Sequence, residues 1–260
     1  MNYIPRRGLT GSEWIGLANF RTFFSSYYFT QYLWNTLRLS IYSLVTGFPL
    51  PIILAIMINE VMNARFKKIF QTISYAPYFI STVVIVSMLK QFFSETGIVN
   101  GLIGLLGREA IYFEAKGESF PHMYVWSGIW QNVGYSSVLY IATLSSVDPQ
   151  LIEAARIDGA NKIQRIWHID IPTIIPTATI MLIFAVGSLL SVGFEKVLLM
   201  QTSINLDYSE VIATYVYKVG ILQSQMSFSA AVGLSNSLAN FILLVSVNFI
   251  IRRMSETSLW

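Results

Sequence analysis

Five long apolar runs, separated by shorter polar stretches, constrain the fold of this chain more than any other feature of its sequence. They cover residues 35–59, 69–93, 121–145, 173–194 and 228–251. Helices of this length would be about 33–38 Å long, enough to cross a hydrocarbon core about 30 Å thick. Only 12% of the residues are charged and 54% are apolar, whereas a typical soluble domain is about 25% charged. The sequence therefore predicts an all-α membrane protein, a polytopic helical bundle with five spans.

The runs divide the chain into three predicted parts. Residues 1–33 are mixed and rich in aromatic side chains and arginine, which favour the headgroup layer, so they form an external or interfacial N-terminal segment. Residues 34–253 form the transmembrane domain, and 254–260 form a short cytoplasmic tail. Between the spans, 94–120 is a polar loop and 195–226 is amphipathic and polar.

Basic residues in the connections predict the orientation. The connections 60–68 and 148–170 each carry three lysines or arginines, and the C-terminal end carries two. With five spans all of these lie on one side, which the positive-inside rule makes the cytoplasm. The basic N-terminal segment then lies outside, which is a conflict. We expect a further span before residue 1 to resolve it, so that the start of the chain is truncated.

The polar island between the third and fourth runs carries the signals of two short helices joined by a turn. Asp148 is a good N-cap residue. Gly159 weakens the helix and permits a turn. Asn161 followed by Gln164 can cap a second helix, and Pro172 opens the next apolar segment. The product is an amphipathic helix–turn–helix suited to docking into a groove on a soluble partner.

Several kinds of chemistry are absent from the sequence. No phosphate-binding P-loop motif occurs, so this chain is not expected to cradle nucleotide phosphates, and no residue is assigned a catalytic role. Cysteine is absent, and the only histidines, His122 and His168, are far apart, so no metal site is predicted. The net charge of +3 is spread over the loops, which argues against nucleic-acid binding.

Polar uncharged and aromatic side chains inside the runs are candidates to line a substrate path. Amides hydrogen-bond to hydroxyls and aromatic faces pack on sugar rings, so such a lining suits a carbohydrate. Interhelical hydrogen bonds and interfacial aromatic belts explain most such residues equally well, and a solvated helix end is the favoured explanation of Glu195. The candidates are Tyr78, Trp130, Gln131, Asn132, Tyr135, Glu195, Asn236 and Asn240.

The polar island also resembles a family signature. Its spacing is similar to that of the EAA motif of binding-protein-dependent ABC importer permeases, with Ile171 where the family has leucine. Segments 66–77, 192–198 and 258–260 resemble the polysaccharide and oligosaccharide branch of that family. The motif residues, which the resemblance assigns to coupling with the ATPase, are Glu153, Ala154, Ala155, Gly159, Ile169 and Pro172.

The resemblance implies a permease subunit in a bacterial cytoplasmic (inner) membrane. Its implied partners are a second, similar permease, two copies of a cytoplasmic ATPase that bind ATP and Mg, and an external sugar-binding protein. The implied cargo is an oligosaccharide, including acidic ones such as alginate or aldouronate. This chain itself would hold no cofactor.

Two alternatives of a different class stay open: an ion-coupled secondary transporter and a membrane scaffold without an ATPase. A secondary transporter should show a buried carboxylate or a broken helix at mid-membrane. No Asp or Glu lies at the centre of a predicted span, although prolines do. A scaffold would need no polar groups inside the bundle.

Overall fold

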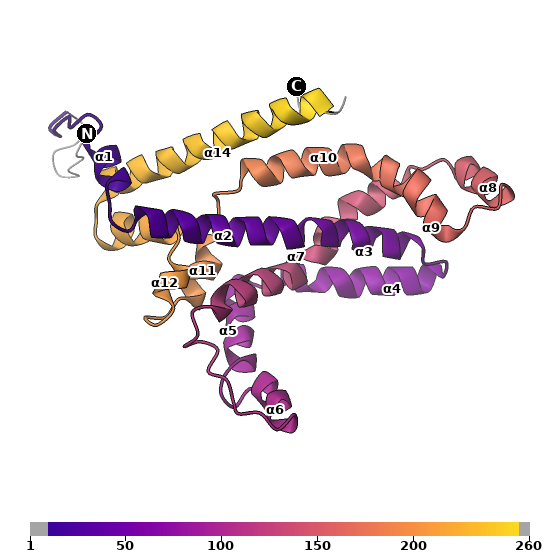
Figure 1. Cartoon of the computed structure of the whole chain (residues 1–260), viewed down its shortest axis with the longest axis horizontal. Helices are drawn as coiled ribbons and strands as arrows, with labels where there is room; N and C mark the ends of the chain where they lie inside the picture. Colours follow the sequence, from indigo (N-terminus) through magenta and orange to yellow (C-terminus); the bar gives the residue numbers. More distant parts are fainter. Residues whose placement is uncertain (1–9, 255–260) are drawn as a thin grey trace. The chain divides into compact units, whose positions relative to one another are not determined.

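The computed structural model describes residues 10–254, and its regular elements in that range are helices (Figure 1). The predicted tail 254–260, apart from the backbone of its first residue, and the 258–260 resemblance lie outside the described residues, as do residues 1–9. The α-helices are α1 (Ala18–Phe24), α2 (Phe29–Gly47), α3 (Pro49–Asn59), α4 (Ala64–Tyr75), α5 (Thr82–Phe92), α6 (Ile98–Leu105), α7 (Ser119–Ser145), α8 (Pro149–Ile157), α9 (Lys162–Arg165), α10 (Ile171–Gly187), α11 (Phe194–Met200), α12 (Leu206–Ser209), α13 (Ile212–Tyr217) and α14 (Met226–Met254). A 3-10 turn, η2 (Ala76–Phe79), follows α4, and π-helical turns η3 (Ile166–Asp170) and η4 (Lys218–Leu222) follow α9 and α13.

The chain forms two compact units. The first unit takes the described parts of Met1–Ile41, Thr82–Val125 and Ser188–Leu243. The second takes Tyr42–Ser81, Trp126–Gly187 and the described part of Leu244–Trp260. Each unit has its own apolar core: Leu39, Val86 and Val197 are among the core residues of the first, and Ile58, Tyr140 and Ile174 among those of the second.

Three predicted spans are continuous apolar helical stretches. Phe29–Asn59, Lys162–Gly187 and Met226–Arg253 have 31, 26 and 28 residues and are long and apolar enough to cross a membrane. The prolines at the start of α3 do not break the first of them, because they occupy the first turn of α3, where a proline removes no intrahelical bond.

The predicted bounds of the fourth span, 173–194, are wrong at both ends. Pro172 does not open a new helix: η3 joins α9 to α10 without a break, so the helical stretch begins at Lys162. Pro172 lies in the first turn of α10, where its missing N–H costs little, and the π-helical turn before it keeps the stretch helical. The helix ends at Gly187, which is packed so closely on Leu244 that a Cβ would lie 2.6 Å from Leu244 Cδ1.

The second predicted span is broken. Ile80 ends η2 in an extended conformation, with φ −79° and ψ 130°, and α5 starts only at Thr82. The two pieces are together apolar enough for one span but are bent at the break. A continuous helix over 69–93 is therefore a wrong prediction. The break is one of the two features expected of a secondary transporter, so this alternative is not excluded by the fold alone.

The third predicted span, α7, has 27 residues and is about 40 Å long. Within residues 10–254, three helices are long and apolar enough to cross a membrane, or four if the bent pair is counted as one span. Helix α7 is not among them. The length of α7 matches the predicted third span, whereas its most apolar stretch is more polar than those of the three helices that qualify as spans. Gly134 lets α4 approach α7 closely, since a Cβ there would lie only 1.9 Å from the carbonyl oxygen of Ser74.

Candidate functional site

The polar island after α7 folds into the predicted hairpin of two short helices (Figure 1). The Asp148 carboxylate caps α8 by accepting from the backbone N–H of Gln150 at 2.9 Å. Asn161 and Gln164 form a reciprocal capping box on α9, with backbone-to-side-chain distances of 2.9 and 2.8 Å. Gly159 turns the chain with φ +80°, a conformation that few other residues adopt. The predicted caps and turn are confirmed.

The hairpin contains a hollow of about 360 Å³. Three of the motif residues, Ala155, Gly159 and Ile169, line it together with polar neighbours that include Gln164 and His168. Since alanine and glycine leave this space open, another chain can approach the backbone of the turn. Large apolar side chains also remain exposed around the hairpin: Leu151, Ile157, Ile163 and Trp167.

The other motif residues lie apart from the hollow. Glu153 and Ala154 are exposed on α8, and Pro172 is exposed in the first turn of α10. The structure thus brings together three of the six motif residues and leaves the rest on the adjoining surface.

An ion cluster that the sequence did not reveal lies beside the hairpin. The carboxylate of Glu60, at the end of α3, accepts from Arg165 Nη2 at 3.3 Å through Oε1 and 3.2 Å through Oε2. The ammonium of Lys162 lies 3.8 Å from Oε2. A pairing over 105 residues has no local sequence signal.

Aromatic path candidates of the second unit meet at the broken helix. The rings of Tyr78 and Tyr135 are stacked, with centroids 3.9 Å apart and planes 9° apart. Both side chains stay partly exposed. The Gln131 amide donates to the carbonyl of Ile80 at 3.1 Å. It thereby satisfies a part-buried carbonyl at the break, where the regular helical bonds stop.

The neighbouring candidates on α7 are not part of that contact. The Asn132 amide donates to the Gly128 carbonyl of its own helix at 2.8 Å, and Trp130 is about half exposed. Nothing in these bonds assigns either residue to a substrate.

The two asparagines of α14 hold the α10–α11 connection. Asn240 Oδ1 accepts from Leu190 N–H at 2.9 Å, and its Nδ2 donates to the Ser191 hydroxyl at 2.9 Å. Asn236 Nδ2 donates to the Leu190 carbonyl at 3.3 Å. Both asparagines therefore make hydrogen bonds between elements. Such bonding within the protein is the other explanation given above for polar residues inside the apolar runs.

Glu195 and Lys196 point in different directions, as expected for adjacent helical residues. Glu195 is exposed, whereas Lys196 is only 9% exposed. The Lys196 side chain is therefore turned into the fold rather than out to solvent. Its ammonium instead donates to the Tyr124 carbonyl at 3.2 Å and lies 5.2 Å from the Tyr124 ring centroid. Burial lowers the pKa of Lys196 to about 8.

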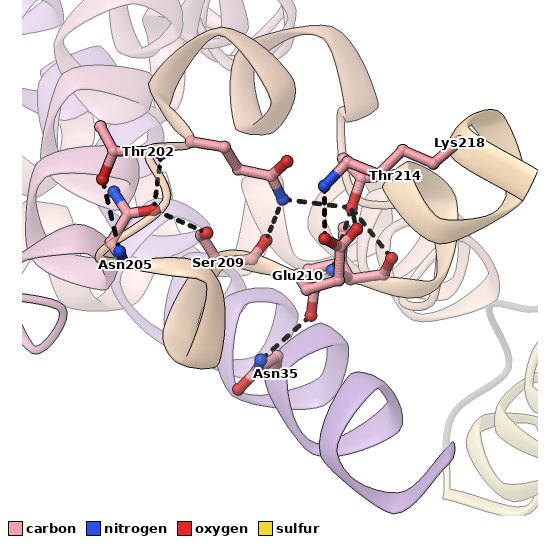
Figure 2. Close-up of polar contacts among 9 residues, drawn as sticks. Asn35, Thr202, Asn205, Ser209, Glu210, Thr214 and Lys218 are labelled. Carbon is pink, nitrogen blue, oxygen red and sulfur yellow. Dashed lines mark hydrogen bonds and ion pairs between the residues drawn. The ribbon is translucent and has the colours of Figure 1, made fainter. Parts of the chain in front are cut away.

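A second polar cluster that the sequence did not reveal fills the first unit around α12 and α13 (Figure 2). Glu210 accepts from the Thr214 hydroxyl at 2.7 Å and pairs with the ammonium of Lys218. The Asn35 amide donates to the Glu210 carbonyl at 3.0 Å, which ties α2 to this segment. Thr214 and Ser209 are fully buried, whereas the Lys218 side chain is 29% exposed, so the cluster is buried except at its lysine.

Comparison with known proteins decides the family. Residues 47–256 match the model of the binding-protein-dependent transport system inner membrane component. The chain belongs to this family. Its similar relatives include permease subunits of importers, so the carrier and scaffold alternatives lose their support.

The permease has similar relatives over its whole length. It is 40% identical over 260 residues to the protein LplB of Bacillus subtilis (strain 168), in a match that covers all of this chain and 82% of LplB. It is 38% identical, again over its full length and 81% of the relative, to the polygalacturonan/rhamnogalacturonan transport system permease protein YteP of the same organism.

A solved structure shares its fold. A chain of a bacterial ABC transporter involved in the import of the acidic polysaccharide alginate superposes with a TM-score of 0.90 and 37% identity, over 94% of this permease and 86% of that chain. A second structure of a bacterial alginate ABC transporter, in complex with an alginate pentasaccharide-bound periplasmic protein, matches with a TM-score of 0.90 and 36% identity, over 94% of this permease and 85% of that chain. The predicted fold class and family are confirmed.

Proposed function

We propose that this permease is the membrane-spanning subunit of an ATP-driven importer of oligosaccharides, and that a cytoplasmic ATPase docks on its α8–α9 hairpin. The observation that carries the proposal is the hairpin itself. It is capped at both helix starts and turned by Gly159, and it combines a hollow of about 360 Å³ with exposed apolar side chains. Apolar residues around a pocket outside the predicted spans are typical of a docking surface.

The helix connections explain how docking would drive transport. Because α9, η3 and α10 form one helical stretch of 26 residues, a displacement of the hairpin is passed directly to the fourth span. ATP-driven closure of two ATPase copies would then switch the bundle between inward-facing and outward-facing states. ATP and Mg would be bound by those subunits, since this chain has no P-loop.

The substrate class is argued from the relatives and from one aromatic contact. YteP is named for polygalacturonan and rhamnogalacturonan transport, and the similar solved transporter imports alginate, so an acidic oligosaccharide is the best-supported cargo. The stacked and partly exposed Tyr78 and Tyr135 would offer a flat apolar face to a sugar ring. Trp130, Gln131 and Asn132 remain path candidates beside them, and Glu195, Asn236 and Asn240 remain candidates in the first unit.

The remaining partners follow from the importer assignment. A second, similar permease would complete a heterodimer in the bacterial cytoplasmic membrane. An external sugar-binding protein would deliver the saccharide, as the periplasmic protein accompanies the similar alginate transporter.

Reconstitution tests the proposal directly. The permease, copurified with its partners, is placed in proteoliposomes and supplied with binding protein and labelled alginate or polygalacturonate oligosaccharides. We expect uptake that requires ATP and Mg and is indifferent to proton and sodium gradients. Uptake driven by an ion gradient without ATP would contradict the proposal and restore the secondary-transporter alternative.

A further inference from the structure

The ion cluster at the end of α3 connects two segments that the chain itself does not join directly. Glu60 follows the last residue of α3, and Arg165 is the last residue of α9. Arg165 Nη2 lies 3.2 and 3.3 Å from the two carboxylate oxygens of Glu60, so the pair is a charge-assisted hydrogen bond to both oxygens. Both residues belong to the second unit.

The two cations of this cluster differ in how deeply they are buried. The Arg165 side chain is 11% exposed and Glu60 22%, whereas Lys162 is 67% exposed and 3.8 Å away. A solvated, distant pair contributes little, because water screens it and the long side chain loses conformational freedom. Removing one partner of a largely buried pair leaves the other charge uncompensated. Arg165 is therefore the cation that holds Glu60.

A second carboxylate, that of Asp170, lies within electrostatic reach of this pair. Asp170 ends η3, is 4% exposed, and is acted on by the charges of both Glu60 and Arg165. The charge of Arg165 thus acts on two carboxylates, but its direct bonds are to Glu60 on the α3 end. The two bonds to Glu60 therefore tie the end of α9 to the end of α3.

We propose that the Glu60–Arg165 pair is a latch that makes the end of the first span move together with the coupling hairpin. Covalent connections tie the hairpin to α7 and α10 alone, whereas the latch adds α3. A displacement imposed on the hairpin therefore reaches three spans at once. Glu60 and Arg165 are positioning residues, and the inference rests on the proposed coupling role of the hairpin.

The test is a distance measurement between spin labels in the intact importer. The chain has no cysteine, so Met62→Cys and Gln150→Cys supply its only labelling sites; Met62 is 90% exposed and Gln150 is also exposed. The complex is studied in nanodiscs without nucleotide and with a non-hydrolysable ATP analogue. The matched control is Lys162→Gln, which removes the exposed cation of the same cluster.

We expect one narrow distance distribution in the labelled parent and in Lys162→Gln, unchanged by nucleotide. Glu60→Gln should broaden it without nucleotide and shift it when the analogue binds, and sugar imported per ATP should fall about fivefold, the low end of coupling factors between sites. Should Glu60→Gln fail to assemble, Arg165→Lys removes the guanidinium but keeps the charge, and the same broadening is expected.

The latch is overturned if these variants keep the parent's narrow distribution in both nucleotide states. The nucleotide-free measurement does not depend on an ATPase. Loss of the proposed function, seen as a permease that copurifies with no ATPase, is therefore distinguishable from loss of the latch.

Discussion

The α8–α9 hairpin of the second unit and the α11–η4 segment of the first unit use polar residues in opposite ways. In the hairpin, Asp148, Asn161 and Gln164 satisfy backbone groups of their own short helices, and the apolar side chains are left exposed. In the α11–η4 segment, Glu210 and Thr214 are buried and bonded to each other (Figure 2).

The difference indicates two kinds of task. A segment whose caps and turn are made by local bonds keeps its own shape without its surroundings and leaves its outer surface available to a partner. A segment whose buried polar groups bond across elements depends on every member, because an unpaired buried group costs about 1–3 kcal/mol. We therefore expect substitutions in the hairpin to affect association and those in the α11–η4 segment to affect stability.

The largest expected effect is at Gly159. Gly159→Pro cannot adopt φ +80° and loses the N–H that donates to Arg156 O at 3.1 Å, so the hairpin cannot close. We expect the ATPase no longer to copurify and uptake to be lost. Gly107→Pro is the matched control, since Gly107 has φ +71° and a similar 3.0 Å bond to Gly104 in the first unit. Equal loss of ATPase in both variants would break the comparison.

The next effect is a pH dependence set by Lys196. Its pKa in the folded chain is about 8, against 10.5 for an ordinary lysine. Between these values the unfolded chain holds a proton that the folded chain has released, so stability should rise with pH across this window, by on the order of 3 kcal/mol. Below about pH 8 both states are protonated and the gain is absent.

Chemical denaturation in detergent across that pH window measures this dependence. Lys196→Met should flatten the rise, whereas Lys90→Met, at an exposed lysine, should leave it unchanged. A rise of the same size in the Lys196 variant would show that another group is responsible.

A smaller loss of stability is expected at Thr214. Thr214→Val keeps the shape but removes the hydroxyl that donates to Glu210 at 2.7 Å and accepts from Val211 N–H at 3.1 Å. The free energy of unfolding should fall by about 2 kcal/mol. Thr72→Val is the control, because that hydroxyl is exposed and bonds only to Lys68 O of its own helix. Matching losses in the two variants would argue against a buried network.

The smallest expected change in stability is on the exposed face of the hairpin. Leu151→Ala should alter the free energy of unfolding by less than about 0.5 kcal/mol, since the side chain is 57% exposed. It should weaken ATPase binding roughly tenfold, if it packs against the partner. Titration of the reconstituted permease with ATPase measures this. A large stability loss without a change in binding would assign Leu151 to the core instead.

Part of the candidate site could be predicted because its determinants are local. Asp148 and Gly159 act on atoms within a few residues of themselves, so cap and turn chemistry is enough to predict the hairpin from the sequence alone. The sequence could name Tyr78 and Tyr135 only as two separate candidates. Their stacking could not be predicted, because the two residues are 57 positions apart along the chain.

The long apolar runs determined that this chain is helical and belongs in a membrane, because a backbone in hydrocarbon must satisfy its own hydrogen bonds. Caps and turn residues determined the hairpin because they act on backbone groups only a few residues away. Tertiary structure alone decided the break at Ile80 and the pairing of Glu60 with Arg165. These depend on which distant groups meet inside the fold, and a charge or carbonyl finds such a partner only after the helices have packed.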